Sequence, residues 1–354
     1  MKAGIVIPSK KDSGQLIEIA MPVSSGSQAF VQLLEVGIDG TDIEINRGEY
    51  GEAPPEDDFI VLGHEAVGQI DDPGTTKLSK GDLVIPLVRR PDGCVNCRSG
   101  RTDMCIGGNY RECGIRGAHG FLREYIVEEP DFLVPAPKEL QTIAVLVEPM
   151  SIATKGTEQA MEFHNRSSSP INSAVVLGAG PLGLLTAALL RLQHFNTYVL
   201  DIVPRSSPKV SLIETIGATY LDGRESALTT LPQKLGNLDL IVEATGNSTV
   251  AFQAISALGV NGVLCLMGVS TGEKPLEICA DCLNMQMVLG NKVVFGTVSS
   301  NRGHFERSIE SLVRIEEKWP GWLSGLITRR LRLDEFAEGL HPTTDNIKTV
   351  IKLT

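Results

Sequence analysis

The sequence is poor in aromatic residues, in positive charge and in long apolar runs. Aromatic side chains make up 5% of the 354 residues, and only two are tryptophans, so stacking platforms for nucleic-acid bases or extended glycans are not expected. The formal net charge of −11 argues against a nucleic-acid partner, because phosphates bind to basic surfaces. No run approaches the roughly 20 apolar residues of a membrane helix, and no signal-peptide cleavage site follows the N-terminal apolar segment. We therefore expect a cytoplasmic protein with no membrane or nucleic-acid partner.

The length and the change of pattern along the chain predict two domains. Roughly 150 residues per domain is a common size, and a hydrophobic content of 42% is enough for sizeable cores. Residues 1–168 contain short apolar or β-branched runs between glycine, proline, aspartate and serine clusters, a pattern typical of a β-rich domain. After residue 172 strands and helices alternate, which predicts a doubly wound parallel sheet. We predict an α/β protein with a catalytic domain at 1–168 and 300–354 and a cofactor domain at 169–299.

A glycine-rich loop lies between a predicted strand and a predicted helix. Its sequence is Gly178-Ala179-Gly180-Pro181-Leu182-Gly183. In this pattern the first glycine allows a tight turn, the second lets a pyrophosphate approach the backbone, and the third permits close helix–strand packing. The helix N-terminus then faces the phosphates. The loop therefore predicts a dinucleotide cofactor.

The choice between NAD and NADP depends on two residues after the next strand. Asp201 ends that strand, where an acidic residue commonly binds the ribose hydroxyls of NAD and repels a 2′-phosphate. Arg205 follows four positions later, where it can meet the 2′-phosphate of NADP if the loop folds back, or simply remain a solvated charge. The sequence favours NAD and leaves the use of both cofactors open.

Four residues far apart in the sequence offer oxygen and imidazole ligands of the kind that a catalytic Zn²⁺ ion binds. They are Asp39, His64, Glu65 and Glu148. His64 and Glu148 are the firmer candidates, and Glu65 is either an alternating ligand or a neighbour of the ligands. In the alternative interpretation Asp39 caps a turn and Glu148 faces solvent. The set predicts a catalytic zinc site with an open position for water or substrate.

The chain has seven cysteines, and four of them follow the spacing C-x2-C-x7-C-x7-C. These four, Cys94, Cys97, Cys105 and Cys113, predict a closed structural zinc site in a short lobe. Asp92 lies close to the position where an additional cysteine is more usual, so three cysteines with a carboxylate are an alternative ligand set. Cys279 and Cys282 also form a C-x2-C pair, but we expect them to be small buried hydrophobic residues of the cofactor domain.

Several motifs resemble those of the zinc-dependent medium-chain alcohol dehydrogenase/reductase superfamily and, within it, the archaeal-type glucose dehydrogenases. The resemblance extends over nearly the whole chain, and its motifs are 37–42, 62–68, 88–91, 112–120, Glu148-Pro149 and 243–246. It implies a GroES-like catalytic domain, a Rossmann cofactor domain and a homo-oligomer (dimer or tetramer). It also implies sugar contacts at Thr41, Glu112, His119, Glu148 and Asn301, and cofactor contacts at Ala244, Thr245, Gly246, Gly268 and Val298.

The reaction implied by the resemblance is NAD(P)-dependent oxidation of an aldose, with glucose as the leading substrate, to an aldonolactone. Zinc would lower the pKa of the C1 hydroxyl, Thr41 would pass its proton toward solvent, and hydride would move from C1 to the nicotinamide. A polyol or threonine dehydrogenase on the same scaffold is an alternative. A catalytically silent cofactor-binding protein is a second alternative, against which the retention of all four candidate ligands argues.

Overall fold

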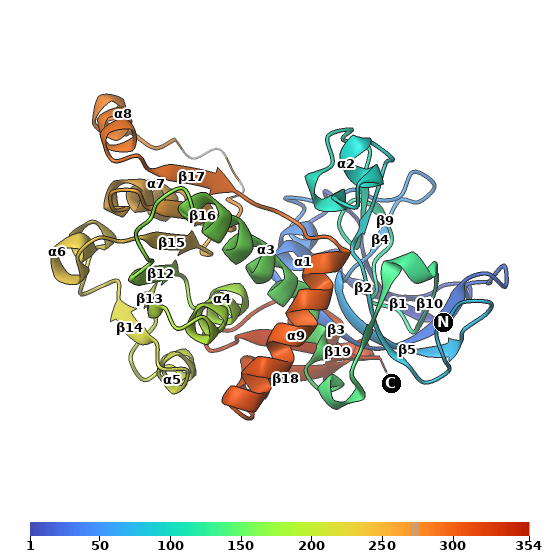
Figure 1. Cartoon of the computed structure of the whole chain (residues 1–354). Helices are drawn as coiled ribbons and strands as arrows, with labels where there is room; N and C mark the ends of the chain where they lie inside the picture. The colour runs from blue at the N-terminus through green and yellow to red at the C-terminus, as the bar shows by residue number, and fades with distance from the viewer. Residues whose placement is uncertain (271, 273–274, 354) are drawn as a thin grey trace. The chain divides into compact units, whose positions relative to one another are not determined.

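A computed structural model describes residues 1–270, 272 and 275–353 (Figure 1). The chain divides into two compact units. The first comprises Met1–Ser151, Ser299–Val313 and Leu323–Thr354, and the second comprises Ile152–Val298 and Arg314–Trp322. The first division lies within a long helix, α3 (Val147–His164), rather than in the polar segment near residue 168. Within the described residues no helix is both long and apolar enough to cross a membrane.

The first unit consists mainly of β-strands, as its short apolar runs predict. Its strands are β1 (Lys2–Val6), β2 (Gln15–Glu18), β3 (Ala29–Ile38), β4 (Ile60–Val61), β5 (Glu65–Asp72), β6 (Leu83–Pro86), β7 (Arg89–Arg90), β8 (Arg111–Cys113), β9 (Gly117–Ala118), β10 (Tyr125–Glu128), β11 (Leu133–Ala136), β18 (Ile327–Arg332) and β19 (Lys348–Lys352). The largest sheet has the order β11-β6-β5-β3-β19-β18, with β10 also paired to β3. Two smaller sheets have the orders β2-β1-β4 and β7-β8-β9.

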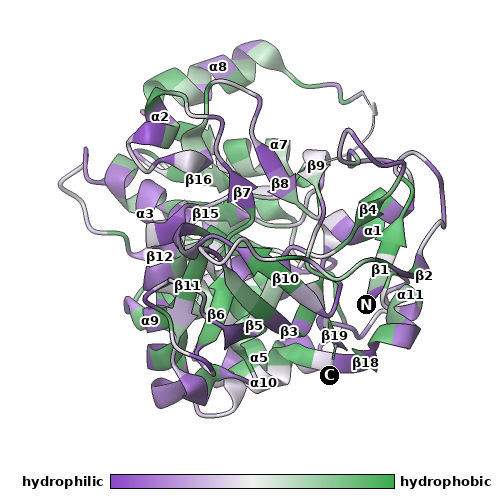
Figure 2. Ribbon diagram, turned by 90° about the vertical axis from the view of Figure 1, so that its right-hand side faces the viewer, coloured by the Kyte–Doolittle hydropathy of each residue, from purple (hydrophilic) through white to green (hydrophobic). Residues whose placement is uncertain are grey.

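The helices of the first unit are few, and most of them are short. They are α1 (Gly40–Asn46), α2 (Val95–Arg98) and α11 (Phe336–Gly339), while α9 (Arg302–Lys318) and α10 (Trp322–Leu326) extend beyond the unit at one end. The core lies against the large sheet and includes Val31, Leu33 and Val36 of β3, all fully buried. The strands β1, β4 and β6 are largely hydrophobic (Figure 2). The ends of β3 and β5 then position the first candidate site.

The second unit contains one parallel sheet with helices between its strands. The strands are β12 (Ser173–Leu177), β13 (Asn196–Asp201), β14 (Thr219–Asp222), β15 (Leu240–Glu243), β16 (Val263–Leu266) and β17 (Val293–Gly296), in the order β14-β13-β12-β15-β16-β17. The helices are α4 (Pro181–Leu192), α5 (Pro208–Thr215), α6 (Leu231–Leu235), α7 (Ser248–Ala257) and α8 (Ala280–Leu289). Each adjacent pair of strands is parallel, so the order is that of a doubly wound dinucleotide-binding sheet. This confirms the predicted fold class.

The central strand of this sheet shows why the sequence forms it. All five residues of β12 are buried, which fits a near-continuous apolar run in a parallel sheet covered on both faces. The chain turns sharply at Gly178, whose φ of +102° favours glycine. Pro181 then occupies the first turn of α4, where its missing N–H is not needed. The glycine-rich loop is therefore at the carboxyl end of β12, as the motif predicts.

Candidate functional site

Asp39 connects β3 to α1, and the local sequence explains its position. It is the N-cap residue of α1, and its Oδ1 accepts hydrogen bonds from the backbone N–H groups of Thr41 (2.8 Å) and Asp42 (3.2 Å). The Oδ2 atom of Asp42 accepts in return from the backbone N–H of Asp39 (3.0 Å). This capping box holds the carboxylate in one place. Asp39 therefore caps a turn, as the alternative interpretation states, and at the same time its Oδ2 lies 3.4 Å from His64 Nε2.

His64 lies in the turn between β4 and β5, directly after a glycine that the turn requires. Gly63 has a φ of +86°, and a Cβ atom there would meet Val36 Cγ1 at 2.5 Å. The backbone N–H of Gly63 donates to Asp42 Oδ1 (3.1 Å), which fixes the turn against α1. Possible ligand atoms of Asp39, His64 and Glu65 all lie within 4.8 Å of one another. One imidazole nitrogen with two carboxylate oxygens is a donor set that fits Zn²⁺.

The charges around His64 favour a cation. Burial alone would lower the pKa of His64, but the attraction of Asp39, with smaller contributions from Asp42 and Glu148, raises it well above its ordinary value. Burial raises the pKa of Asp42 to about 7 and that of Glu148 to about 8, because buried carboxylates are poorly solvated. A bound metal ion would add positive charge to this buried acidic group.

A lysine that no sequence motif indicated completes the electrostatics of the cluster. Lys348 of β19 forms an ion pair with Glu65, and the side chains of both residues are almost fully buried, at 1% and 2% exposure. Burial raises the pKa of Glu65, and the charge of Lys348 opposes that rise. The sequence does contain a signal for this contact. Lys348 lies in the mainly apolar run 347–353, and a charged side chain buried in such a strand needs an oppositely charged partner. Lys348 and a metal ion at this cluster would therefore compete for the same carboxylate.

Glu148 and Thr41 belong to the same unit as Asp39, His64 and Glu65. Glu148 is buried in the first turn of α3, rather than facing solvent, and its charge interacts with those of His64 and Glu65. The hydroxyl of Thr41 donates to Asp39 Oδ2 at 3.4 Å. Thr41 therefore touches a carboxylate of the cluster.

The other three predicted sugar contacts are engaged with protein groups. Glu112 is buried, and its Oε1 accepts from Arg89 Nε (3.0 Å) and Nη2 (2.8 Å). The side-chain amide of Asn301 donates to Asp103 Oδ1 (2.7 Å). Both ring nitrogens of His119 are in use: Nδ1 accepts from the N–H of Val61 (3.2 Å) and Nε2 lies 3.1 Å from Asp57 Oδ2.

In the cysteine lobe the structure groups the alternative candidate ligands, three cysteines with a carboxylate. Asp92, Cys94, Cys97 and Cys105 bring possible ligand atoms within 4.8 Å of one another. The Cys94 and Cys97 sulfurs are 3.5 Å apart, and those of Cys94 and Cys105 are 3.9 Å apart. Cys113, predicted as the fourth ligand, lies in β8 and is buried in the hydrophobic core of the unit. Asp92 is the fourth group near the sulfurs, and its Oδ1 is held there by a hydrogen bond from the backbone N–H of Cys94 (3.0 Å).

The chemistry of the four groups fits zinc as well as their distances do. Backbone hydrogen bonding, mainly at Cys97, lowers the pKa of the Cys94 thiol to about 6, whereas burial raises that of Cys97 to about 11. A backbone hydrogen bond from Cys94 lowers the pKa of Asp92 to about 2. A metal ion would hold all three sulfurs as thiolates and remain beside an ionised carboxylate.

The expectation that Cys279 and Cys282 are buried hydrophobic residues is wrong. Both side chains are exposed, and a disulfide joins them at the start of α8. No residue of α8 is buried, so the apolar residues of this helix do not enter the core. Leu276 and Ile278, which precede the helix, are 40% and 44% exposed.

The second unit has a pocket of about 620 Å³ at the carboxyl ends of its central strands. Its lining includes the predicted residues Gly178, Gly180, Asp201, Ala244 and Thr245, together with Leu177, Leu200, Ile202, Gly223, Ala227, Leu228, Asn247, Val250 and Gln253, which the motif did not indicate. Ala179, Pro181, Leu182, Gly183, Arg205, Gly246, Gly268 and Val298 are outside this lining. A pocket at this end of a doubly wound sheet is where such folds bind dinucleotides.

Two glycines of the loop have different surroundings, which give them different roles. A Cβ atom on Gly183 would lie 2.0 Å from the carbonyl oxygen of Gly178, whereas nothing lies within 4 Å of a Cβ on Gly180. Gly183 is therefore required for the packing of α4 on the loop, and Gly180 leaves open space for a ligand. These are the separate roles that the motif assigns to the two glycines.

Asp201 and Arg205 differ in their relation to the pocket. The Asp201 carboxylate lines it and accepts hydrogen bonds from the backbone N–H groups of Ala179 (2.5 Å), Ile202 (2.6 Å) and Val203 (3.2 Å). The exposed side chain of Arg205 is 3.5 Å from Glu225 Oε2. The negative charge thus faces the pocket, and the positive charge is paired with another carboxylate.

Comparison with known proteins gives matches over the whole chain. The family pattern described as "Glucose dehydrogenase C-terminus" matches residues 141–353, and that of the "Alcohol dehydrogenase GroES-like domain" matches residues 25–138. The glucose 1-dehydrogenase of Methanocella arvoryzae is 42% identical over 100% of this chain and 99% of its own length. The enzyme of the same name from Haloarcula marismortui is 39% identical over 96% of each chain.

A solved structure supports the same relationship. Glucose dehydrogenase of Haloferax mediterranei, in complex with NADP, Zn and gluconolactone, has a TM-score of 0.93 and 36% identity over 100% of this chain and 99% of that one. The glycine-rich loop, the parallel sheet, the zinc-fitting cluster and these matches lead to one conclusion. The chain belongs to the family of zinc-dependent, GroES-like glucose dehydrogenases.

Proposed function

We propose that this protein oxidises an aldose, with D-glucose as the leading substrate, at C1 to the aldonolactone with NAD(P) and zinc. The observation that carries the proposal is the buried cluster of Asp39, His64 and Glu65, in a chain whose full-length relatives are named glucose 1-dehydrogenases. When bound, zinc would polarise the C1 hydroxyl and lower its pKa. Asp39, His64 and Glu148 would hold the ion, and Glu65 would alternate between the ion and Lys348.

The proton of the C1 hydroxyl and the hydride of C1 would leave by different routes. The hydroxyl of Thr41, already bonded to Asp39, would accept the proton of the C1 hydroxyl and pass it toward solvent. The hydride would pass from C1 to the nicotinamide, which balances the reaction as aldose and NAD(P)⁺ giving lactone, NAD(P)H and one proton. This division of roles makes the first unit responsible for the sugar and the second for the cofactor.

The sugar hydroxyls would be oriented by buried polar groups. Both Arg89 bonds to Glu112 use Oε1, which leaves Oε2 as an acceptor for a hydroxyl. Asn301 is fixed by Asp103 and would present its amide to the ring. His119 would contact sugar only after Asp57 moved away, because both of its nitrogens are engaged. A plain alcohol has no ring hydroxyl for Glu112 Oε2, so we expect it to be a poor substrate.

We also propose that NAD is used more efficiently than NADP. The support is the Asp201 carboxylate in the pocket lining, while Arg205 is paired with Glu225 outside it. A 2′-phosphate close to Asp201 would bring two negative charges together, at a cost on the order of 1 kcal/mol or more.

The metal-binding lobe is a separate part of the proposal. We propose that Asp92, Cys94, Cys97 and Cys105 hold a structural zinc ion, because these groups form a compact tetrad in a segment with little hydrophobic core of its own. A cytoplasmic location agrees with the use of clustered thiols as ligands.

We further propose that the protein is a homo-oligomer that associates through the second unit. Strand β17 is the edge of the parallel sheet, and the side chains of Val260, Met285, Val288 and Leu289 nearby are all more than half exposed. Three of these residues line a surface pocket of about 430 Å³. Exposed apolar groups at a sheet edge are typical of association surfaces. Light scattering of wild type and of Leu289→Asp tests this directly, with a monomer expected for the variant.

One panel of substrates tests the main proposal. Glucose, galactose, xylose, sorbitol, threonine and ethanol are each offered with NAD and with NADP, and kcat/KM is measured for every pair. We expect the aldoses to be oxidised and the last three compounds to be poor substrates. If kcat/KM is highest for sorbitol or threonine, the protein is a polyol or threonine dehydrogenase rather than an aldose dehydrogenase. If zinc-loaded protein turns over none of these compounds, it is a cofactor-binding protein without this activity.

A further inference from the structure

Cys279 and Cys282, which have no part in the proposed sugar oxidation, form a disulfide. Cys279 is the N-cap residue of α8, and Cys282 lies in the first turn of the same helix. Their Cα atoms are 5.3 Å apart, within the usual range for a disulfide. The other five cysteines are either grouped in the lobe with Asp92 or, like Cys265, buried. The pair is thus chemically separate from the remaining thiols of the chain.

The disulfide contributes little as a structural brace. It joins residues only three positions apart, and a cross-link stabilises a protein less when the loop that it closes is shorter. It connects no second element, because both cysteines belong to the start of α8. A bond with so small an effect on folding is free to open without unfolding the unit.

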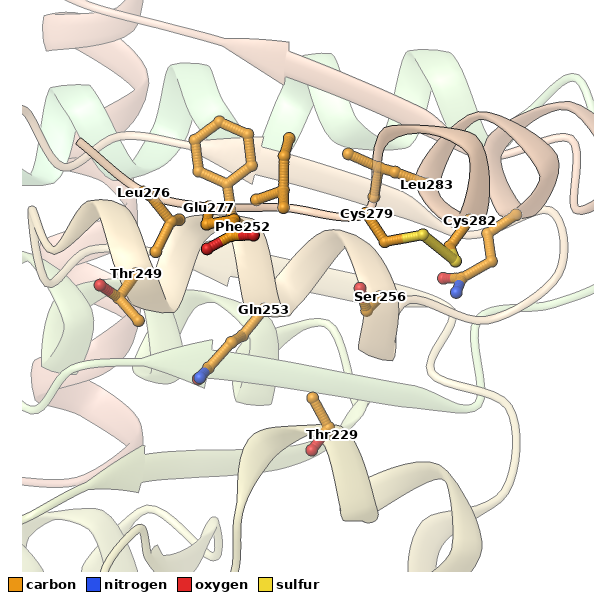
Figure 3. A pocket seen from close by; sticks show the side chains of 12 residues that line it. Thr229, Thr249, Phe252, Gln253, Ser256, Leu276, Glu277, Cys279, Cys282 and Leu283 are labelled. Carbon is orange, nitrogen blue, oxygen red and sulfur yellow. A yellow bond between two sulfur atoms is a disulfide. The ribbon is translucent and has the colours of Figure 1, made fainter.

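Both cysteines are exposed and line a surface pocket. This pocket has a volume of about 260 Å³ and is lined by residues of α7 and α8 together with the segment that precedes α8. Figure 3 shows the disulfide at the start of α8, with Ser256 of α7 nearby and Phe252 and Leu276 farther along the same pocket. The lining combines apolar side chains with the hydroxyls of Thr249 and Ser256. A pocket of this size admits a small organic thiol next to the bond.

The helix start also favours reversible opening. The partial positive charge of a helix N-terminus stabilises a thiolate, which lowers the pKa of a cysteine there and makes it a better leaving group. Two carboxylates, Glu277 in the pocket lining and Asp281 in the first turn, oppose this effect. Stabilisation of the reduced form gives an exposed disulfide a more oxidising potential than a buried structural one.

We propose that Cys279 and Cys282 form a redox-active dithiol/disulfide site that exchanges with low-molecular-weight thiols. A thiolate of the small molecule attacks one sulfur, forms a mixed disulfide with it and expels the other as a thiolate, which takes up a proton. A second small thiol then displaces the first. Two electrons pass from two thiols, which become one small disulfide, to the protein pair, which becomes two thiols. This site goes beyond the proposed sugar oxidation and does not rest on it.

The test follows the two cysteines in the native, full-length protein. Samples that start either oxidised or reduced are held in defined mixtures of reduced and oxidised glutathione, quenched with acid and alkylated. Mass spectrometry of the peptide that contains both cysteines then gives the fraction reduced. We expect both starting states to converge on the same fraction, with a single two-electron transition, while the buried Cys265 thiol stays unmodified by glutathione.

Two variants make the result specific. Cys282→Ser removes the partner thiol, so Cys279 should retain glutathione as a stable mixed disulfide. Cys265→Ala is the matched control and should leave the equilibrium of the pair unchanged. The proposal is overturned if the native pair stays reduced in oxidised glutathione. It is also overturned if the bond opens only in denaturant or only with a protein dithiol.

Discussion

The ion pair between Lys348 and Glu65 allows a quantitative test of the catalytic cluster. Lys348→Met removes the positive charge and keeps a side chain of similar length. The side chains of both partners are at most 2% exposed, so water cannot replace the lost partner. A Cβ on Gly37 would meet Glu65 Oε2 at 2.1 Å, which shows how closely the backbone packs on this carboxylate. Removing one partner of a buried ion pair destabilises a protein by about 3–5 kcal/mol, and we expect a loss of this size in zinc-free protein.

Zinc should relieve part of this loss, because the ion is a second positive partner for Glu65. If zinc recovers about 1.4–2.8 kcal/mol, linkage requires that the variant bind zinc about 10–100-fold more tightly than wild type. Urea unfolding followed by circular dichroism measures the stability with and without a chelator, and competition with a zinc indicator measures the affinity. The double variant Lys348→Met/Glu65→Gln is the matched control, since it removes both charges.

Three results would contradict this reasoning. A zinc-free Lys348→Met protein within about 1 kcal/mol of wild type would show that the pair is not a buried charge couple. A double variant that recovers no stability relative to Lys348→Met would show that the loss does not arise at Glu65. Unchanged or weaker zinc binding in the single variant would show that Lys348 and the metal do not compete for Glu65.

Three further predictions concern the metals and the cofactor. His64→Ala should abolish turnover while cofactor binding, followed by NADH fluorescence, and the circular dichroism spectrum stay unchanged; full activity in this variant or in metal-stripped protein would exclude the zinc mechanism. Wild type should contain two Zn²⁺ per chain by elemental analysis, and Cys97→Ser should lose one together with thermal stability, whereas Cys113→Ala should keep both; absence of the second ion in wild type would refute the lobe site. Asp201→Gly should shift the NADP/NAD ratio of kcat/KM toward NADP by about fivefold or more, the equivalent of about 1 kcal/mol, and a wild type that prefers NADP tenfold would show that Asp201 does not govern the choice.

Local sequence patterns carried most of the information about the fold. The glycine-rich loop between β12 and α4 was visible because two of its three glycines have a backbone reason: a positive φ at Gly178 and a close approach at Gly183. The alternation of strands and helices after residue 172 likewise follows from the burial of parallel strands on both faces. The capping box at Asp39 is also local, since its partners are two and three residues away.

The sites depended on contacts between distant segments, which no local pattern encodes. The sequence spacing of the cysteines pointed to Cys113 as a ligand, but the side chain of that residue is in the core and Asp92 is beside the sulfurs. The segment around Cys279 and Cys282 is apolar enough to be buried, and only the tertiary structure shows that both cysteines are exposed.

The sequence by itself thus determined the two kinds of unit, the cofactor loop and the residue types available for a metal. Only the tertiary structure decided which of them meet. It brought Lys348, at the far end of the chain, to Glu65, because β19 pairs with β3 and β3 pairs with β5. Strand pairing of this kind is set by the packing of the whole sheet, so the partner of a buried charge is a property of the fold rather than of the neighbouring residues.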